Sequence, residues 1–315
     1  MKLHHFRDLL AVAETGSLRS AARHLGLAQP VITRSIQELE RELGVALFDR
    51  HAKGVTLTEK GMMFVRRVEA FQADLQRARD EIAQSKEELV GEISVVFSPV
   101  ICMTVMPRIL TAFSKRYPQV VLRISEGLFQ TVEAQLENGV IDFWVGPLEL
   151  SVSHPRFSVE QLFDTSRTVV GRTGHPLREA KNLAELKDCG WVRPALSKRT
   201  TETDFTPIFE DAGLPQPKFL VHSGSPLITI LAVASTDLLT MLPVHTFRFS
   251  SLSKLIQKFD NIEPFYSAPI CNVKRHGLQL TPAAEHLCDL IRKAAHNFIL
   301  EEGSGQSVFD TQSDR

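Results

Sequence analysis

The chain has 315 residues and a net charge of -1, with 43% hydrophobic and 23% charged residues. This length predicts two or three domains, and the near-neutral charge excludes a protein coated in basic residues. No apolar run approaches the roughly 20 residues needed to span a bilayer, and the amphipathic N-terminus lacks the apolar core of a secretory signal. We therefore expect a cytoplasmic protein with no membrane partner.

The first sixty residues predict a helix-turn-helix. A helix over residues 3–14 ends at Gly16, and Ser17 is a natural N-cap for a second helix that Gly26 terminates. A third helix begins at Gln29-Pro30, where a proline is tolerated because first-turn amides lack intrahelical partners. In this pattern the later helix enters the DNA major groove.

The third helix carries the candidate base contacts. Its apolar residues Val31, Ile32, Ile36, Leu39 and Leu43 are expected to face the core. Glutamine can pair with adenine and arginine with guanine, so we expect the outward residues near its start to read base edges. These candidates are Gln29, Pro30, Thr33, Arg34 and Gln37.

Residues 47–57 predict a short hairpin, or wing, that turns at Gly54. Basic and hydroxyl groups on the wing and on the second helix suit contacts with phosphates or the minor groove. The candidates for these contacts are Ser17, Arg19, Arg50, His51 and Lys53. A solvated surface position is the alternative for each of them.

Residues 59–90 predict a long linker helix capped by Thr58. Its apolar residues follow a heptad pattern, which favours a dimerising coiled coil over packing within one domain. They are Phe64, Val68, Phe71, Leu75, Ala78, Ile82 and Leu89.

The pattern changes after Gly91 to strands alternating with helices, which is typical of parallel α/β sheets. The expected strands are residues 93–97, 120–125, 141–145, 168–170, 190–192 and 218–221. The expected helices are residues 105–117, 130–138, 205–212, 227–234 and 282–300. Residues 301–315 are expected to form a disordered tail.

These features resemble the LysR-type transcriptional regulators. The specific part is SLRSAARHLGLAQPVITRSIQELERELGVALFDR, followed by GVTLTEKG. Most members have Ser-Gln-Pro where this chain has Ala28-Gln29-Pro30. The missing hydroxyl removes a side-chain cap, which lowers the stability of the helix by about 1 kcal/mol. Shorter matches, such as Gly174-His175-Pro176-Leu177, extend the resemblance to residue 300.

The resemblance implies an all-α winged helix-turn-helix domain over residues 1–58 and an α/β regulatory region like a periplasmic binding protein. Lobe I would comprise residues 91–165 and 267–300, and lobe II residues 166–266. It also implies a homodimer joined through the linker helix, a homotetramer, an inverted-repeat operator in double-stranded DNA and contact with RNA polymerase.

In this arrangement a small-molecule effector would bind between the lobes. Hydroxyls and free amides where strands lead into helices suit a small anion, with lysine and arginine adding charge and apolar groups holding the body. Ordinary helix capping is the alternative for each hydroxyl. The candidates are Ser98, Pro99, Val100, Thr104, Phe129, Thr131, Pro147, Lys198, Arg199, Thr200, Thr201, Ser223, Ser225, Pro226 and Phe265.

Other functional classes lack a sequence signal. The chain contains no GxSxG, HExxH, Walker or GxGxxG motif and its histidines are dispersed, so we expect neither an enzyme nor a metal or cofactor site. Cys102, Cys189, Cys271 and Cys288 lack CxxC spacing and are expected to be reduced and mostly buried. A thiol-based redox sensor of the same fold is the alternative that remains open.

Overall fold

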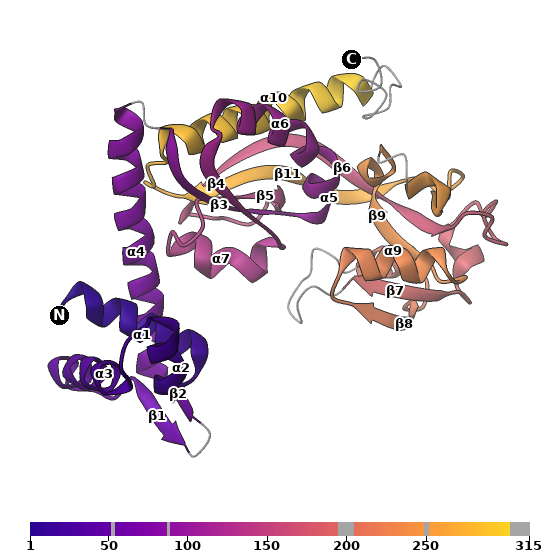
Figure 1. Cartoon of the computed structure of the whole chain (residues 1–315). Coiled ribbons are helices and arrows are strands. Elements are labelled where there is room, and N and C mark those ends of the chain that lie inside the picture. Colours follow the sequence, from indigo (N-terminus) through magenta and orange to yellow (C-terminus); the bar gives the residue numbers. More distant parts are fainter. Residues whose placement is uncertain (52–53, 87–88, 195–204, 249–251, 303–315) are drawn as a thin grey trace. The chain divides into compact units, whose positions relative to one another are not determined.

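The computed structural model describes residues 1–51, 54–86, 89–194, 205–248 and 252–302 (Figure 1). The chain divides into two compact units. The first comprises Met1–Arg79 with Asn138–Val140, and the second comprises Asp80–Glu137 with Ile141–Arg315. No helix in the described ranges is both long and apolar enough to cross a membrane.

The first unit contains the predicted winged helix-turn-helix. Its elements are α1 (Leu3–Thr15), α2 (Leu18–His24), α3 (Gln29–Leu43), β1 (Phe48–His51) and β2 (Gly54–Leu57). Ser17 caps α2 as expected, because its side chain accepts a hydrogen bond from the Ser20 amide at 3.4 Å. Thr58 caps the start of α4 (Glu59–Ser85) by accepting from the Gly61 amide at 2.9 Å.

Close backbone contact fixes the wing against the turn between α1 and α2. The Val55 amide donates to the Gly16 carbonyl at 2.9 Å. Gly54 has a φ of 143°, and a Cβ atom there would lie 2.5 Å from the Gly16 oxygen. Only glycine therefore permits this approach without a shift of the backbone.

The structure corrects two expectations for the helices of this region. Val31 does not face the core: it is 51% exposed, whereas Ile32, Ile36 and Leu39 are buried. The linker helix ends at Ser85 rather than at residue 90, and Val90 is already the first residue of strand β3 (Val90–Phe97). Leu89 therefore lies outside the helical stripe and packs against the core of the second unit.

The second unit is built on a seven-stranded mixed sheet (Figure 1). The path runs β10-β6-β11-β5-β3-β4, with β9 also paired to β6, and a separate two-stranded sheet joins β7 and β8. The bounds are β3 Val90–Phe97, β4 Gln119–Glu126, β5 Phe143–Pro147, β6 Phe157–Arg172, β7 Gly190–Pro194, β8 Lys218–Ser223, β9 Thr240–Pro243, β10 Ile256–Lys258 and β11 Phe265–Arg275. Strands β3, β4 and β5 are parallel, and β6 pairs antiparallel with β11.

Helices cover these sheets. The α-helices are α5 Pro99–Thr104, α6 Met106–Arg116, α7 Phe129–Glu137, α8 Thr206–Asp211, α9 Pro226–Ala234 and α10 Pro282–Glu302. Short 3-10 helices occupy Leu183–Leu186, Val244–Arg248 and Leu252–Lys254. The helix expected at residues 105–117 is α6, with the short helix α5 directly before it, and the expected strand at 168–170 is part of a 16-residue strand.

Two long strands run through the regions predicted as lobes I and II. The crossings expected near residues 165 and 267 fall inside β6 and β11, which run without interruption through both lobes. One core lies between the sheet and α6 and α10, with Phe97, Phe113 and Phe298 fully buried. A second core, in lobe II, contains Trp191 and Phe209, whose rings meet edge to face at 5.2 Å.

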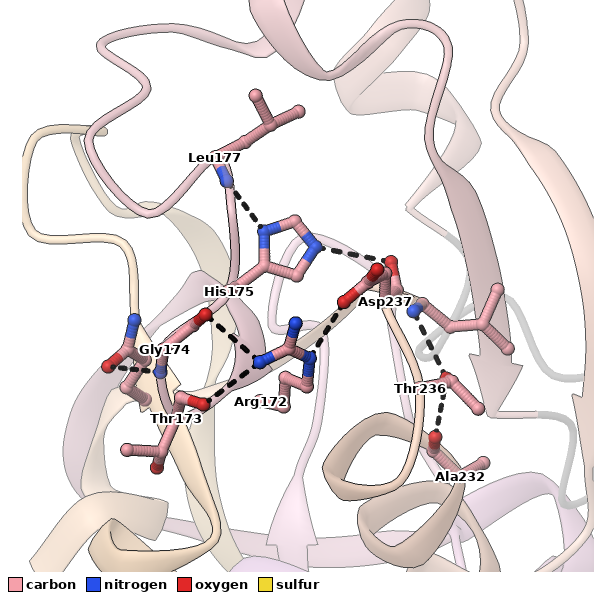
Figure 2. A network of polar contacts seen from close by, with 10 residues as sticks. Arg172, Thr173, Gly174, His175, Leu177, Ala232, Thr236 and Asp237 are labelled. Carbon is pink, nitrogen blue, oxygen red and sulfur yellow. Dashed lines mark hydrogen bonds and ion pairs between the residues drawn. The ribbon is translucent and has the colours of Figure 1, made fainter.

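A polar network closes the turn that follows β6 (Figure 2). Buried His175 accepts a hydrogen bond from the Leu177 amide at Nδ1 (3.1 Å), and its Nε2 lies 3.2 Å from the Asp237 carbonyl oxygen. Because Nδ1 accepts, Nε2 carries the proton and donates to Asp237. Arg172 also pairs with the Asp237 carboxylate at 2.7 Å, so the network ties β6 to the segment after α9.

Candidate nucleic-acid interface and ligand cleft

The start of α3 presents the predicted base-reading groups to solvent. Gln29, Pro30, Arg34 and Gln37 are exposed, whereas Thr33 is half-buried and donates its hydroxyl to the Gln29 carbonyl at 3.0 Å. The exposed side chains lie on one side of the helix, opposite the buried residues Ile32, Ile36 and Leu39.

Val31 joins this surface, although the sequence analysis placed it in the core. It lines a shallow depression of about 290 Å³ together with Pro30, Arg34, Ser35, Glu38 and His4. The helical spacing could have predicted this exposure, because Val31 is three residues before Arg34 and lies on the same face of the helix. An exposed valine beside an arginine can contact a thymine methyl group.

The acidic residues of α3 lie in its second half, and Glu38 lines the same depression as Pro30 and Arg34. Glu40 accepts hydrogen bonds from the Leu47 and Phe48 amides at 2.7 and 3.2 Å. Glu42 pairs with the terminal ammonium of Met1, which lowers the pKa of that carboxyl. Glu38 lies 3.6 Å from the ring of His5. The anionic groups therefore lie on the later turns of the helix.

The candidate phosphate contacts lie on α2 and the wing. Arg19, Arg50 and His51 are exposed, and the His51 Nε2 atom lies 3.0 Å from the Thr56 hydroxyl on the neighbouring strand. Ser17 is half-buried and already serves as the cap of α2. Lys53 lies outside the described residues.

The second unit contains a cleft of about 90 Å³. Most of its lining is apolar. The lining residues are Ser98, Pro99, Val100, Met103, Leu128, Pro147, Thr165, Arg167, Pro194, Ser225, Pro226, Thr229, Ile230, Met241, Leu242, Pro243, Thr246, Ser267 and Ile270.

Two hydroxyls in this cleft are buried and have no hydrogen-bond partner among the described residues. The Oγ of Ser98 and the Oγ1 of Thr246 both belong to side chains with no exposed surface. Leaving a polar group buried and unpaired costs about 1–3 kcal/mol, so such groups mark a place where a ligand can bind. Arg167 adds a cation to the lining, and its Nε lies 3.4 Å from the Ser267 hydroxyl oxygen.

Six of the predicted effector residues line the cleft: Ser98, Pro99, Val100, Pro147, Ser225 and Pro226. Lys198, Arg199, Thr200 and Thr201 lie outside the described residues.

Five other predicted residues do not line the cleft. Thr104 and Ser223 are buried and donate to the carbonyls of Val100 and Ser225, respectively. Thr131 is exposed and donates to the Leu128 carbonyl.

The two aromatic candidates also lie outside the cleft lining, because both rings pack in hydrophobic cores. Phe129 packs against Trp144, and Phe265 packs against the lobe II core.

Sequence reasoning missed the residues that the long strands bring to the cleft. Thr165 and Arg167 are two residues apart on β6 and therefore share one face of the sheet. Ser267 is the partner of Thr165 on β11, next to an irregularity in the register. The alternation could have linked Thr165 with Arg167, but the pairing with β11 is a long-range contact that local sequence does not encode.

The environments of the four thiols raise their pKa values. Burial raises the pKa of Cys102, Cys271 and Cys288 to about 12, and it also raises that of Cys189. Reaction with peroxide requires the thiolate, which these environments disfavour. Across the described residues, no group of three or more His, Cys, Asp or Glu side chains could hold a metal ion.

Comparison with known proteins gives matches over both units. The family model described as "LysR substrate binding domain" matches residues 86–296, and "Bacterial regulatory helix-turn-helix protein, lysR family" matches residues 3–62. The HTH-type transcriptional regulator GbpR of Azospirillum brasilense is 28% identical over 246 residues, covering 76% of this chain and 71% of that protein. BsdA of Bacillus subtilis (strain 168) is 28% identical over 253 residues, covering 78% and 86%.

Solved structures share the fold. The LysR family transcriptional regulator CbnR superimposes with a TM-score of 0.68 at 20% identity, covering 94% of this chain and 99% of that one. Full-length CbnR in complex with its target DNA gives the same TM-score at 19% identity, with 93% and 100% covered.

Proposed function

The chain belongs to the LysR family of bacterial transcriptional regulators, and we propose that a small organic anion bound in its cleft controls how it acts on an operator. The observation that carries the proposal is the pair of unpartnered hydroxyls, Ser98 and Thr246, in a cleft that also contains Arg167. A carboxylate would accept hydrogen bonds from both hydroxyls and meet the positive charge of the guanidinium.

The lining also indicates the shape of the ligand. Met103, Leu128, Ile230 and Met241 offer apolar contacts, so the ligand would have a compact ring or branched alkyl body attached to its acidic group. Burial of that body supplies affinity, and the polar groups fix its orientation.

Matched pairs of ligands test the charge requirement. A panel of small aromatic and branched carboxylic acids is screened by thermal shift beside the corresponding primary amides. We expect acids to stabilise the protein and amides to do so much less, and Ser98→Ala should reduce the response. Equal stabilisation by acid and amide, or by amides alone, would show that the ligand is not an anion.

We propose that the DNA-binding form is a dimer joined through α4. Phe71 and Ile82 are 46% and 59% exposed on this helix, on the heptad face predicted from the sequence. Two such helices would bury these groups against each other and present two recognition helices to an inverted repeat. Contact with RNA polymerase and a cytoplasmic location belong to the same proposal.

A second apolar surface could join dimers into a tetramer. Leu227, Ile228 and Leu231 on α9 are 65%, 54% and 50% exposed, and Leu220 on the edge strand β8 is 56% exposed. Such a group of exposed apolar side chains favours burial in an interface.

Sedimentation tests both interfaces. Leu227→Glu should give dimers in place of tetramers, and Ile82→Asp should abolish the dimer. Gln72→Asp, an exposed change elsewhere on α4, should leave the assembly unchanged, and an unaltered mass for all three variants would contradict both interfaces.

The thiol-based alternative is not proposed, because the raised pKa values leave little thiolate for reaction with an oxidant.

A further inference from the structure

The end of α4 is fixed to lobe I by a buried glutamine. Gln84 is 8% exposed, and its Nε2 donates to the Val90 carbonyl at 2.9 Å. Its Oε1 accepts from the Ala283 amide, also at 2.9 Å. First-turn amides of a helix have no partner within that helix, so Gln84 caps α10 from a distant part of the chain. One side chain therefore joins α4, β3 and α10.

A buried aspartate lies one helical turn earlier, on the same face of α4. Asp80 is 5% exposed, and its Oδ2 accepts from the Glu92 amide at 3.0 Å. The intervening Gly91 has a φ of 131°, and a Cβ atom there would lie 2.8 Å from the Asp80 carboxyl carbon. Glycine at this position allows the carboxylate to reach the strand.

Strand β3 leads directly from these two residues to the ligand cleft. It pairs along its whole length with β4 and near its end with β5, and Ile93 and Phe97 are fully buried. The next residue is Ser98, whose unpartnered hydroxyl lines the cleft. At about 3.3 Å per residue, this strand carries an axial displacement over roughly 26 Å. Paired with β4 over its whole length and closely packed, the strand resists bending.

We infer that Asp80 and Gln84 are positioning residues that couple the ligand cleft to α4. A ligand that accepts a hydrogen bond from Ser98 acts on the end of β3. The start of β3 is held by the side chains of Asp80 and Gln84. A displacement of β3 and α10 would then be transmitted to the end of α4. The inference rests on the proposed function, since it supposes that α4 carries the DNA-binding unit.

Coupling is reciprocal, so DNA can serve as the probe while the effector is unidentified. An operator duplex is first selected from a random pool with the full-length chain. Amide hydrogen exchange is then measured with and without that duplex, in peptides covering residues 89–97 and 280–286. We expect operator binding to change exchange at both places in the wild-type chain.

Three variants separate coupling from simple stability. Gln84→Leu removes both hydrogen bonds, and the DNA-induced difference should vanish at both peptides although the operator is still bound. Gln84→Glu keeps an acceptor for Ala283 but has no donor for Val90, so the difference should persist at residues 280–286 and vanish at 89–97. Gln72→Leu, at an exposed position of the same helix, should behave as the wild type.

The outcomes distinguish coupling through Gln84 from a purely structural role. Faster exchange in Gln84→Leu with an intact DNA-induced difference would mean that Gln84 only stabilises the fold, and it would overturn the inference. The absence of any DNA-induced change at residues 89–97 in the wild type would overturn it as well. Failure to select any operator would count against the proposed function itself, which is a distinguishable result.

Discussion

Removal of the Thr246 hydroxyl should stabilise the ligand-free protein. This hydroxyl is buried and unpartnered, and valine has nearly the same shape without the polar group. Taking the lower end of the roughly 1–3 kcal/mol cost of an unpaired buried group, we expect Thr246→Val to raise the free energy of unfolding by about 1 kcal/mol. For a unit of this size, that corresponds to a melting temperature higher by about 2–4 °C.

The same change should weaken ligand binding. A hydrogen bond to a charged group contributes about 1.5–3 kcal/mol, so the affinity for a carboxylate that binds in the cleft should fall roughly 10- to 100-fold. Differential scanning calorimetry gives the first quantity, and titration with an acid identified by the thermal-shift panel gives the second. The opposite signs of the two effects are typical of a group retained for binding rather than for stability.

Thr240 provides the matched control. It is also fully buried, but its Oγ1 donates to the Val192 carbonyl at 3.0 Å. Thr240→Val leaves that carbonyl without this donor and should lower the free energy of unfolding by about 1–2 kcal/mol. If both valine substitutions lower the melting temperature alike, the Thr246 hydroxyl is satisfied in the folded protein and the reasoning is wrong.

Three further predictions concern the operator contact, the thiols and the lobe II turn. Val31→Ala should weaken operator binding by about 1 kcal/mol through loss of a methyl contact, and the loss should disappear in gel shifts when uracil replaces the contacted thymine; an unchanged loss would exclude that contact. Cys102, with a pKa raised to about 12 by burial, should react with thiol reagents only slowly at pH 7 and faster as pH rises, because the thiolate fraction grows tenfold per pH unit below the pKa; rapid neutral labelling of native protein would contradict this. His175→Ala should lower the free energy of unfolding by about 2 kcal/mol, since the Leu177 amide and the Asp237 carbonyl each lose a partner; His175→Asn tests whether a shorter acceptor restores part of the loss in chemical denaturation.

Local signals predicted the DNA-binding unit well because its elements are determined by near neighbours. Ser17 and Thr58 are caps whose partners lie three residues away, and Gly16 and Gly54 adopt the positive φ that their turns need. Val31 was assigned to the core because hydrophobicity alone does not distinguish an apolar residue that packs inside from one that faces DNA.

The regulatory unit was predicted less completely, because its cleft depends on long-range pairing. Arg167 and Ser267 are 100 residues apart in sequence and meet only because β6 pairs with β11. The end of α4 was misplaced for a similar reason. The heptad pattern continues to Leu89, but the helix ends at Ser85. Gln84 is hydrogen-bonded to the Val90 carbonyl in β3 and to the Ala283 amide, which is far away in the sequence. Periodicity within one segment carries no information about such a partner.

The bonds from the Glu40 carboxylate to the Leu47 and Phe48 amides have a consequence for regulation. They fasten the first wing strand to the back of the recognition helix, so both groove-reading parts are preassembled before any duplex arrives. We therefore expect effector binding to leave the internal structure of the winged helix-turn-helix unchanged. Under the proposed function, an effector would change the distance and angle between the two DNA-binding units of a dimer, and with them the spacing of half-sites that the dimer binds.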